Sequence, residues 1–121
     1  MPHYLVASNL RTQRTLASRV SRADDFASRS RGLLGKTGME PGEALWIEPC
    51  AMIHTFFMKF PIDVLFLDKE RKAVRAIENI KPFRLSPWVT GARSVLEFAA
   101  GTLKSAGGAL PGDAISLTFS S

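Results

Sequence analysis

Five side chains capable of chemistry precede the terminal Asp68 in one aromatic-rich, apolar stretch of the chain, residues 49–68: Cys50, His54, Thr55, Lys59 and Asp63. A thiol and an imidazole can act as a nucleophile and its base, and a carboxylate can orient the imidazole. Burying polar or charged groups without partners costs free energy or shifts their pKa values. These residues therefore mark either a site or a set of structural buttresses.

A hydrolase-like enzyme is one interpretation, with His54 and Asp63 as its working pair and Cys50 as a further participant. Cys50 and His54 are four residues apart, too far for contact along a strand unless Cys50 lies in the entering turn. Asp63 could join them only if the chain folds back at Pro61. A metal site built from the same three residues lacks ligand-like spacing, so we expect no metal and no other cofactor.

Binding of a small polar molecule is the hypothesis that we prefer from the sequence. Thr55 and Lys59 would share one face of a strand, and Asp63 follows the turn at Pro61. A cavity near this turn would offer a hydroxyl, a cation and a carboxylate, with Phe57 as an apolar wall. The competing interpretation is that these charges form structural ion pairs with one another and leave no room for a ligand.

The neighbours of this expected site are Cys50, His54 and Glu97. Glu97 is the lone charge in the apolar run from Val95 to Ala100, so it requires a cation. The candidates for that cation are Arg31, Arg84 and Arg93.

The composition indicates a single domain, residues 1–121, with 45% hydrophobic residues and enough length to bury a core. One cysteine excludes an internal disulfide. The sequence shows no apolar run long enough to span a membrane and no signal peptide, so we expect a cytoplasmic protein. The oligomeric state is left open.

The formal charge of +5 lies wholly in the first third of the chain, where residues 1–36 hold seven basic and two acidic side chains. Such a segment could meet a nucleic-acid backbone or an acidic lipid. We instead expect a solvated face whose arginines partly pair with carboxylates, because no nucleic-acid motif accompanies the charge. A nucleic-acid-binding accessory protein is the weakest of the three functional hypotheses.

Short strands predominate in the predicted secondary structure. They are expected at 4–8, 15–20, 44–48, 53–57, 63–67, 73–77, 94–98 and 115–119. One helix is expected from Ala23 to Leu34, capped by Ser21 and ended by Gly35, and one helical turn within 101–108. Residues 81–91 are expected to form an ordered loop. This pattern predicts a mainly β fold, a barrel or a jelly-roll-like sandwich with one helix in the N-terminal half.

The chain resembles the domain of unknown function 192 family from about residue 20 to its end. The resemblance rests on the segments RGLL (31–34), IHTFFMKFPIDV (53–64), FLD (66–68), GAR (91–93), VLE (95–97) and GD (112–113). It implies a compact β-barrel or jelly-roll-like sandwich found as a bacterial or archaeal domain. It implies no activity and no roles for individual residues.

Overall fold

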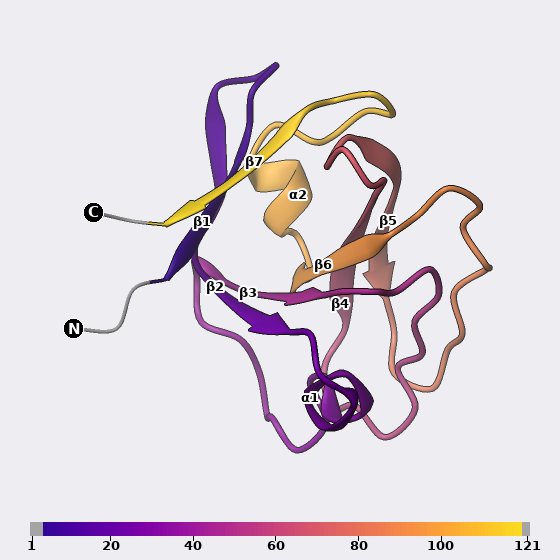
Figure 1. The fold of residues 1–121 in the computed structure, drawn as a ribbon. Helices are drawn as coiled ribbons and strands as arrows, with labels where there is room; N and C mark the ends of the chain where they lie inside the picture. The colour runs from indigo at the N-terminus through magenta and orange to yellow at the C-terminus, as the bar shows by residue number, and fades with distance from the viewer. Residues whose placement is uncertain (1–3, 120–121) are drawn as a thin grey trace.

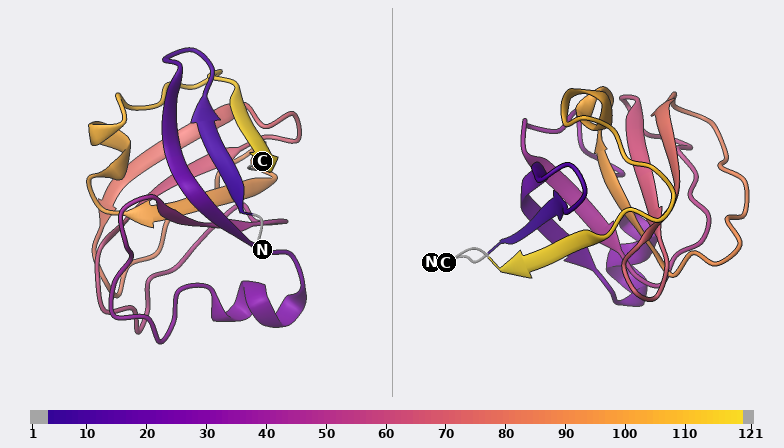
Figure 2. Two further views of the ribbon diagram at one scale, coloured as in Figure 1. Left: turned by 90° about the vertical axis from the view of Figure 1, so that its left-hand side faces the viewer. Right: turned by 90° about the horizontal axis from the view of Figure 1, so that it is seen from above.

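A strongly curled, seven-stranded sheet forms the body of the molecule (Figure 1, Figure 2). The computed structural model describes residues 4–119, apart from the side chains of residues 26, 30 and 31. The strands are β1 (Leu5–Asn9), β2 (Arg14–Ala23), β3 (Glu43–Ile47), β4 (Ile62–Leu67), β5 (Ala73–Ile80), β6 (Ser94–Ala99) and β7 (Ile115–Phe119). Two short helices complete it, α1 (Phe26–Arg31) and α2 (Thr102–Ser105). The expected mainly β barrel-like fold is confirmed.

The strand order is β5-β4-β6-β3-β2-β1-β7, and every neighbouring pair is antiparallel except the parallel pair of β2 and β3. A parallel pair needs a crossover connection, and α1 lies in that crossover. The curl brings the two edge strands together at one end. There the Gly112 amide donates to the Ala73 carbonyl at 2.7 Å and the Ala73 amide to the Asp113 carbonyl at 2.8 Å.

Both faces of the central strands are covered. β4, with the sequence IDVLFL, is buried at all six positions, and a strand buried on both faces is typically a continuous β-branched and aromatic run. On its concave, barrel face, Leu65 and Leu67 join a core with Trp46, Phe98 and Leu103.

On the opposite face, Val64 and Phe66 join a second core with Leu33, Ile53 and Met58. Accordingly, α1 and α2 lie on opposite sides of the sheet (Figure 1). We call the layer made by α1 and the loops around residues 49–60 the cap.

Three predicted element boundaries were wrong. The helix covers Phe26–Arg31 only, because the Asp25 side chain accepts the Ser28 amide at 2.7 Å and Gly32 ends the helix with φ +50°. Ser21 lies within β2. Residues 53–57 are not a strand: only His54 makes a β-bridge, to Leu85. The remaining strands, the loop at 81–91 and the turn of helix within 101–108 are confirmed, with ends displaced by up to three residues.

Candidate functional site

Thr55 is a structural residue that joins two loops. It is fully buried, its hydroxyl donates to the Lys81 carbonyl at 2.6 Å and it accepts the Arg84 amide at 2.8 Å. These bonds tie the loop at 51–58 to the loop at 81–89. The Thr55 hydroxyl is thus fully occupied by backbone partners.

Asp63 is also committed to the fold. It is fully buried, and its carboxylate accepts the amides of Asn79 at 2.9 Å and of Gly101 and Leu103 at 3.0 Å each. The last two amides belong to the N-terminal turn of α2, whose unpaired N–H groups need such acceptors. Asp63 is therefore one of the structural buttresses that the sequence allowed as an alternative to a site.

Lys59 and Phe57 point away from these residues. Both are exposed, and Phe57 has φ +65°, so the backbone turns sharply between Thr55 and Lys59. The strand geometry that would have placed Thr55 and Lys59 on one face is therefore absent. Thr55, Phe57, Lys59 and Asp63 do not line any of the three cavities found in the described part of the chain.

Glu97 lies instead at the wall of a cavity beneath the cap. On β6, Val95 and Glu97 face the cap while Leu96 and Phe98 face the barrel. The cavity, of about 140 Å³, is lined by polar or sulfur-bearing Arg29, Cys50, Met52, His54, Met58 and Glu97 and by Gly32, Leu33, Leu34, Ile47, Pro49 and Ile53. Here a buried acidic side chain adjoins a gap between the cap and the sheet.

The Glu97 carboxyl group has no partner among the described residues. It is only 3% exposed, and no hydrogen bond or ion pair joins it to any side chain or backbone group that the structure describes. Burial raises its pKa to about 7, because the charged form loses hydration without gaining a counter-ion. Of the cations expected from the sequence, Arg84 and Arg93 are exposed, and the Arg31 side chain lies outside the described residues.

Cys50 and His54 both line this cavity but are not arranged as a nucleophile and base. The Cys50 thiol donates to the Met52 carbonyl at 3.2 Å, and His54 Nδ1 accepts the Phe56 amide at 3.3 Å. Burial, with a smaller contribution from the charge of Glu97, raises the pKa of Cys50 above its ordinary value. A thiol held in its protonated form is a poor nucleophile.

Asp63 cannot orient His54, because the two lie on opposite sides of β4. Asp63 precedes Val64, which packs under the cap, and its own side chain reaches α2 on the barrel side. The hydrolase-like pair of His54 and Asp63 is therefore not brought together. Within residues 4–119, no three His, Cys, Asp or Glu side chains cluster as metal ligands would.

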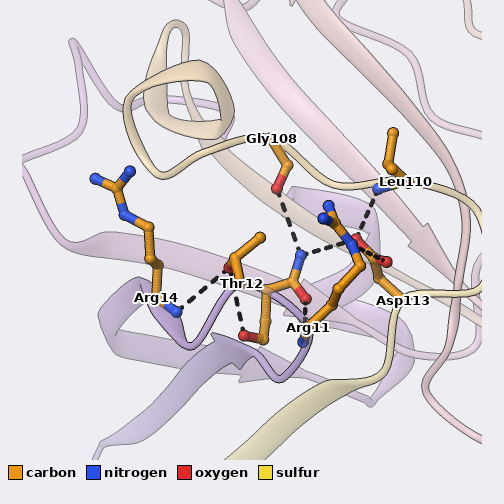
Figure 3. A network of polar contacts seen from close by, with 7 residues as sticks. Arg11, Thr12, Arg14, Gly108, Leu110 and Asp113 are labelled. Atoms are coloured by element: carbon orange, nitrogen blue, oxygen red, sulfur yellow. Dashed lines mark hydrogen bonds and ion pairs between the residues drawn. The ribbon is translucent and has the colours of Figure 1, made fainter.

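The cations of the first third are spread over the molecule. Arg11 pairs with Asp113, Arg22 with Asp24 and Lys36 with Glu43, as the solvated, partly paired interpretation expects. Asp113 is the centre of a network that joins the β1–β2 turn to the loop before β7 (Figure 3). Its carboxylate accepts Arg11 Nε at 2.6 Å, Asn9 Nδ2 at 2.9 Å and the Leu110 amide at 2.8 Å.

The Arg11 guanidinium holds the pKa of Asp113 down at about 2. Asp113 is thus a structural tie between the first and last strands of the sheet.

Arg29 and Met58 are cavity residues that the sequence did not single out. Arg29 lies on α1 and is half-buried, and Met58 is buried in the cap core. The signal for Met58 was slight, since an apolar residue in an apolar block indicates only packing. Among the described residues no membrane-spanning helix is present.

Comparison with known proteins gives consistent matches. The family model for DUF192, described as an uncharacterised ACR, matches residues 8–117. A UPF0127 protein of Pyrococcus abyssi is 37% identical over 92 residues, which cover 71% of this chain and 75% of that protein.

Two solved structures share the fold. A protein of unknown function from Novosphingobium aromaticivorans superposes with a TM-score of 0.81 at 21% identity, covering 94% of this chain and 84% of that one. A protein from Sinorhizobium meliloti, described as a proposed transcription regulator, gives a TM-score of 0.79 at 24% identity and covers 95% and 92%.

Proposed function

Since the chain belongs to the uncharacterised domain of unknown function 192 family, which assigns no activity, we propose from the geometry that it is a small-molecule-binding module. The ligand would occupy the cavity beneath the cap. The observation that carries the proposal is the buried carboxyl group of Glu97, which adjoins that cavity and has no partner among the described residues.

The chemistry of the walls defines the kind of ligand. A buried carboxylate without a partner is costly, and a bound cation or N–H donor would remove that cost. The remaining walls include the side chain of Arg29 and the apolar side chains of Leu33, Ile47 and Ile53, and these apolar side chains suit an apolar body. The ligand class is therefore a compact molecule with an ammonium, amidinium or amide head and a short apolar part.

The size of the cavity restricts the ligand further. At about 140 Å³ it exceeds the space for a single water, yet it is smaller than the roughly 300–1,000 Å³ that hold drug-sized molecules. Cys50 and His54, both expected as site neighbours, contribute to this site together with Glu97. Thr55 and Asp63 support it only by holding the scaffold.

The test is a crystallographic soak with small primary amines and amidines and with their uncharged isosteres. We expect density for a cationic fragment with its nitrogen within hydrogen-bond distance of Glu97. In solution, the same fragment should bind at least tenfold more weakly to Glu97→Gln, with Glu78→Gln, an exposed carboxylate on β5, as the matched control. Fragments that bind only outside the cavity, or equally well to Glu97→Gln, would contradict the proposal.

A further inference from the structure

Two loops, residues 51–58 and 81–92, lie next to each other on the side of the molecule away from the chain ends (Figure 1). Four backbone hydrogen bonds of 2.8–2.9 Å hold them side by side: Thr55 N to Arg84 O, Phe83 N to Thr55 O, Ser86 N to Ile53 O and Val89 N to Ala51 O. The pairing fixes which side chains of each loop face outward.

Alternation along the first loop places apolar side chains in solvent. Ile53 and Thr55 point inward and are buried, whereas Met52, His54 and Phe56 are exposed. Leu85 lies opposite His54 in the β-bridge. The first loop therefore has apolar side chains on its exposed side as well as buried side chains on its inner side. The exposed ones are not needed to fill the core.

Six large apolar side chains make up this surface, which we call the loop surface: Met52, Phe56, Phe57, Phe83, Leu85 and Trp88. Phe57 is 75% exposed, Trp88 70%, Leu85 58% and Phe83 54%. Phe57 and Phe83 touch edge to face, with their ring centroids 5.6 Å apart. Exposed apolar residues scattered singly need no explanation, but a cluster on two paired loops indicates an interaction site.

Two of these residues hold conformations that bulky side chains rarely adopt. Phe57 has φ +65° and Phe83 has φ +62°, in the left-handed region that favours glycine or asparagine. The backbone therefore displays both rings at an energetic cost, and packing in the core does not offset that cost because the rings are exposed. Such strain is typical of functional loops.

The charge around the loop surface has one sign. Residues 49–62 and 79–96 contain no Asp or Glu, while they contain Lys59, Lys81, Arg84 and Arg93. All four cations are exposed. An anionic partner would meet no repulsive carboxylate on either loop.

We propose that the loop surface docks on an anionic phospholipid bilayer, with Phe57, Leu85 and Trp88 entering the headgroup region and the four cations contacting lipid phosphates and carboxylates. Aromatic and aliphatic side chains flanked by Lys and Arg are the usual composition of interfacial membrane contacts. This function goes beyond ligand binding in the cavity and does not depend on it.

The side-chain set favours lipid over single-stranded nucleic acid. Base stacking uses aromatic faces along the path of the strand, whereas Leu85 and Met52 offer none, and in the edge-to-face pair of Phe57 and Phe83 one ring covers a face of the other. A second copy of the chain would place like charges against each other across a self-complementary interface.

The experiment is co-sedimentation of the full chain with vesicles of 70% phosphatidylcholine and 30% phosphatidylserine, against vesicles of phosphatidylcholine alone. We expect at least tenfold tighter binding to the anionic vesicles, weakened by raising the salt, and a blue shift of Trp88 fluorescence. Trp46 is buried and serves as an unchanging background. Binding should fall at least tenfold in the double variant Phe57→Ala/Trp88→Ala and in Lys81→Gln/Arg84→Gln.

Two matched variants control for loss of an exposed side chain elsewhere. Phe119→Ala removes an equally exposed phenylalanine from β7, and Lys69→Gln/Lys72→Gln removes two exposed lysines beyond the other end of β4; both should bind vesicles as the parent does. Absence of binding to the anionic vesicles by the folded parent would overturn the proposal. So would loss of binding in the control variants, a dimer by light scattering that Phe57→Ala/Trp88→Ala dissolves, or tight oligothymidylate binding without vesicle binding.

Discussion

Replacing Glu97 with Gln should stabilise the protein at alkaline pH and change its stability little in acid. The pKa of Glu97 is about 7 in the folded chain against an ordinary value of 4.5, so folding favours the protonated carboxyl group. At roughly 1.4 kcal/mol per pKa unit, ionisation of this buried group costs about 3 kcal/mol of unfolding free energy. Gln has a similar shape and never ionises.

The direction of the pH dependence follows from which state binds more protons. Between pH 4.5 and 7 the folded protein keeps the Glu97 proton that the unfolded chain has lost, so this group stabilises the fold below pH 4.5 and loses that contribution as the pH rises through 7. The stability gained by Glu97→Gln should therefore grow from near zero at pH 4.5 to about 3 kcal/mol at pH 8.

Urea denaturation of the parent and of Glu97→Gln at these two pH values measures the effect, because titrating groups that do not interact with Glu97 cancel in the difference between the variants. Glu78→Gln, at an exposed position on β5, is the matched control. An equal difference at both pH values, or a Gln variant less stable at pH 8, would refute the reasoning. An equal difference would mean that folding does not raise the pKa of Glu97, and a less stable Gln variant would mean that the fold stabilises the charged carboxylate.

Three other substitutions test the structural assignments. Asp63→Ala should lower the unfolding free energy by about 3 kcal/mol in urea denaturation, because three backbone amides lose their acceptor; an unchanged midpoint would contradict the assignment. Alkylation of Cys50 by iodoacetamide should reach its half-maximal rate above pH 9.0, because burial raises the thiol pKa, and the midpoint should fall in Glu97→Gln. Asp113, with its pKa lowered to about 2 from 3.8, stabilises the fold above pH 3.8 and loses that contribution as the pH falls toward 2. Asp113→Asn should therefore lose less stability than the parent over that acid range, as measured by thermal unfolding.

The strands could be predicted from the sequence because their signals are local. The hairpin of β4 and β5 has a β-branched run on each side of the polar turn at 68–72, and β7 was placed correctly from Ile115 to Phe119. The predicted helix, Ala23 to Leu34, was longer than α1 because the sequence offers more than one residue for each end. In the structure Asp25 caps the first turn and Gly32 ends the helix. Ser21 and Gly35 are residue types as typical of helix ends as Asp25 and Gly32 are. Ser21 does not cap the helix because it lies in β2 and pairs with β3, which the local sequence does not reveal.

The candidate site was predicted less well, because it depends on which face of a strand meets which layer. The alternation of side chains along a strand shows that Asp63 and Val64 point to opposite faces of the sheet. It does not show that the face with Asp63 is covered by α2 and that the face with Glu97 is covered by the cap. The predicted strand at 53–57 failed because Phe57 turns the chain with positive φ, a conformation that the residue type argues against. The sequence identified Glu97 as a lone charge in an apolar run. It did not identify the residues of the cap that surround Glu97 in the folded protein.

The pairing of β1 with β7 has a consequence for biosynthesis. β1 ends at Asn9 and β7 begins at Ile115, so the ribosome must add about 100 residues before the hydrogen bonds from Leu5 to Asn9 acquire their second partner. At typical translation speeds this delay is on the order of 5–20 s. Throughout it, β1 presents an unpaired strand edge, which is a template for aggregation. Closure of the sheet is therefore a late, non-local step, because the second neighbour of β1 is the last strand to be synthesised.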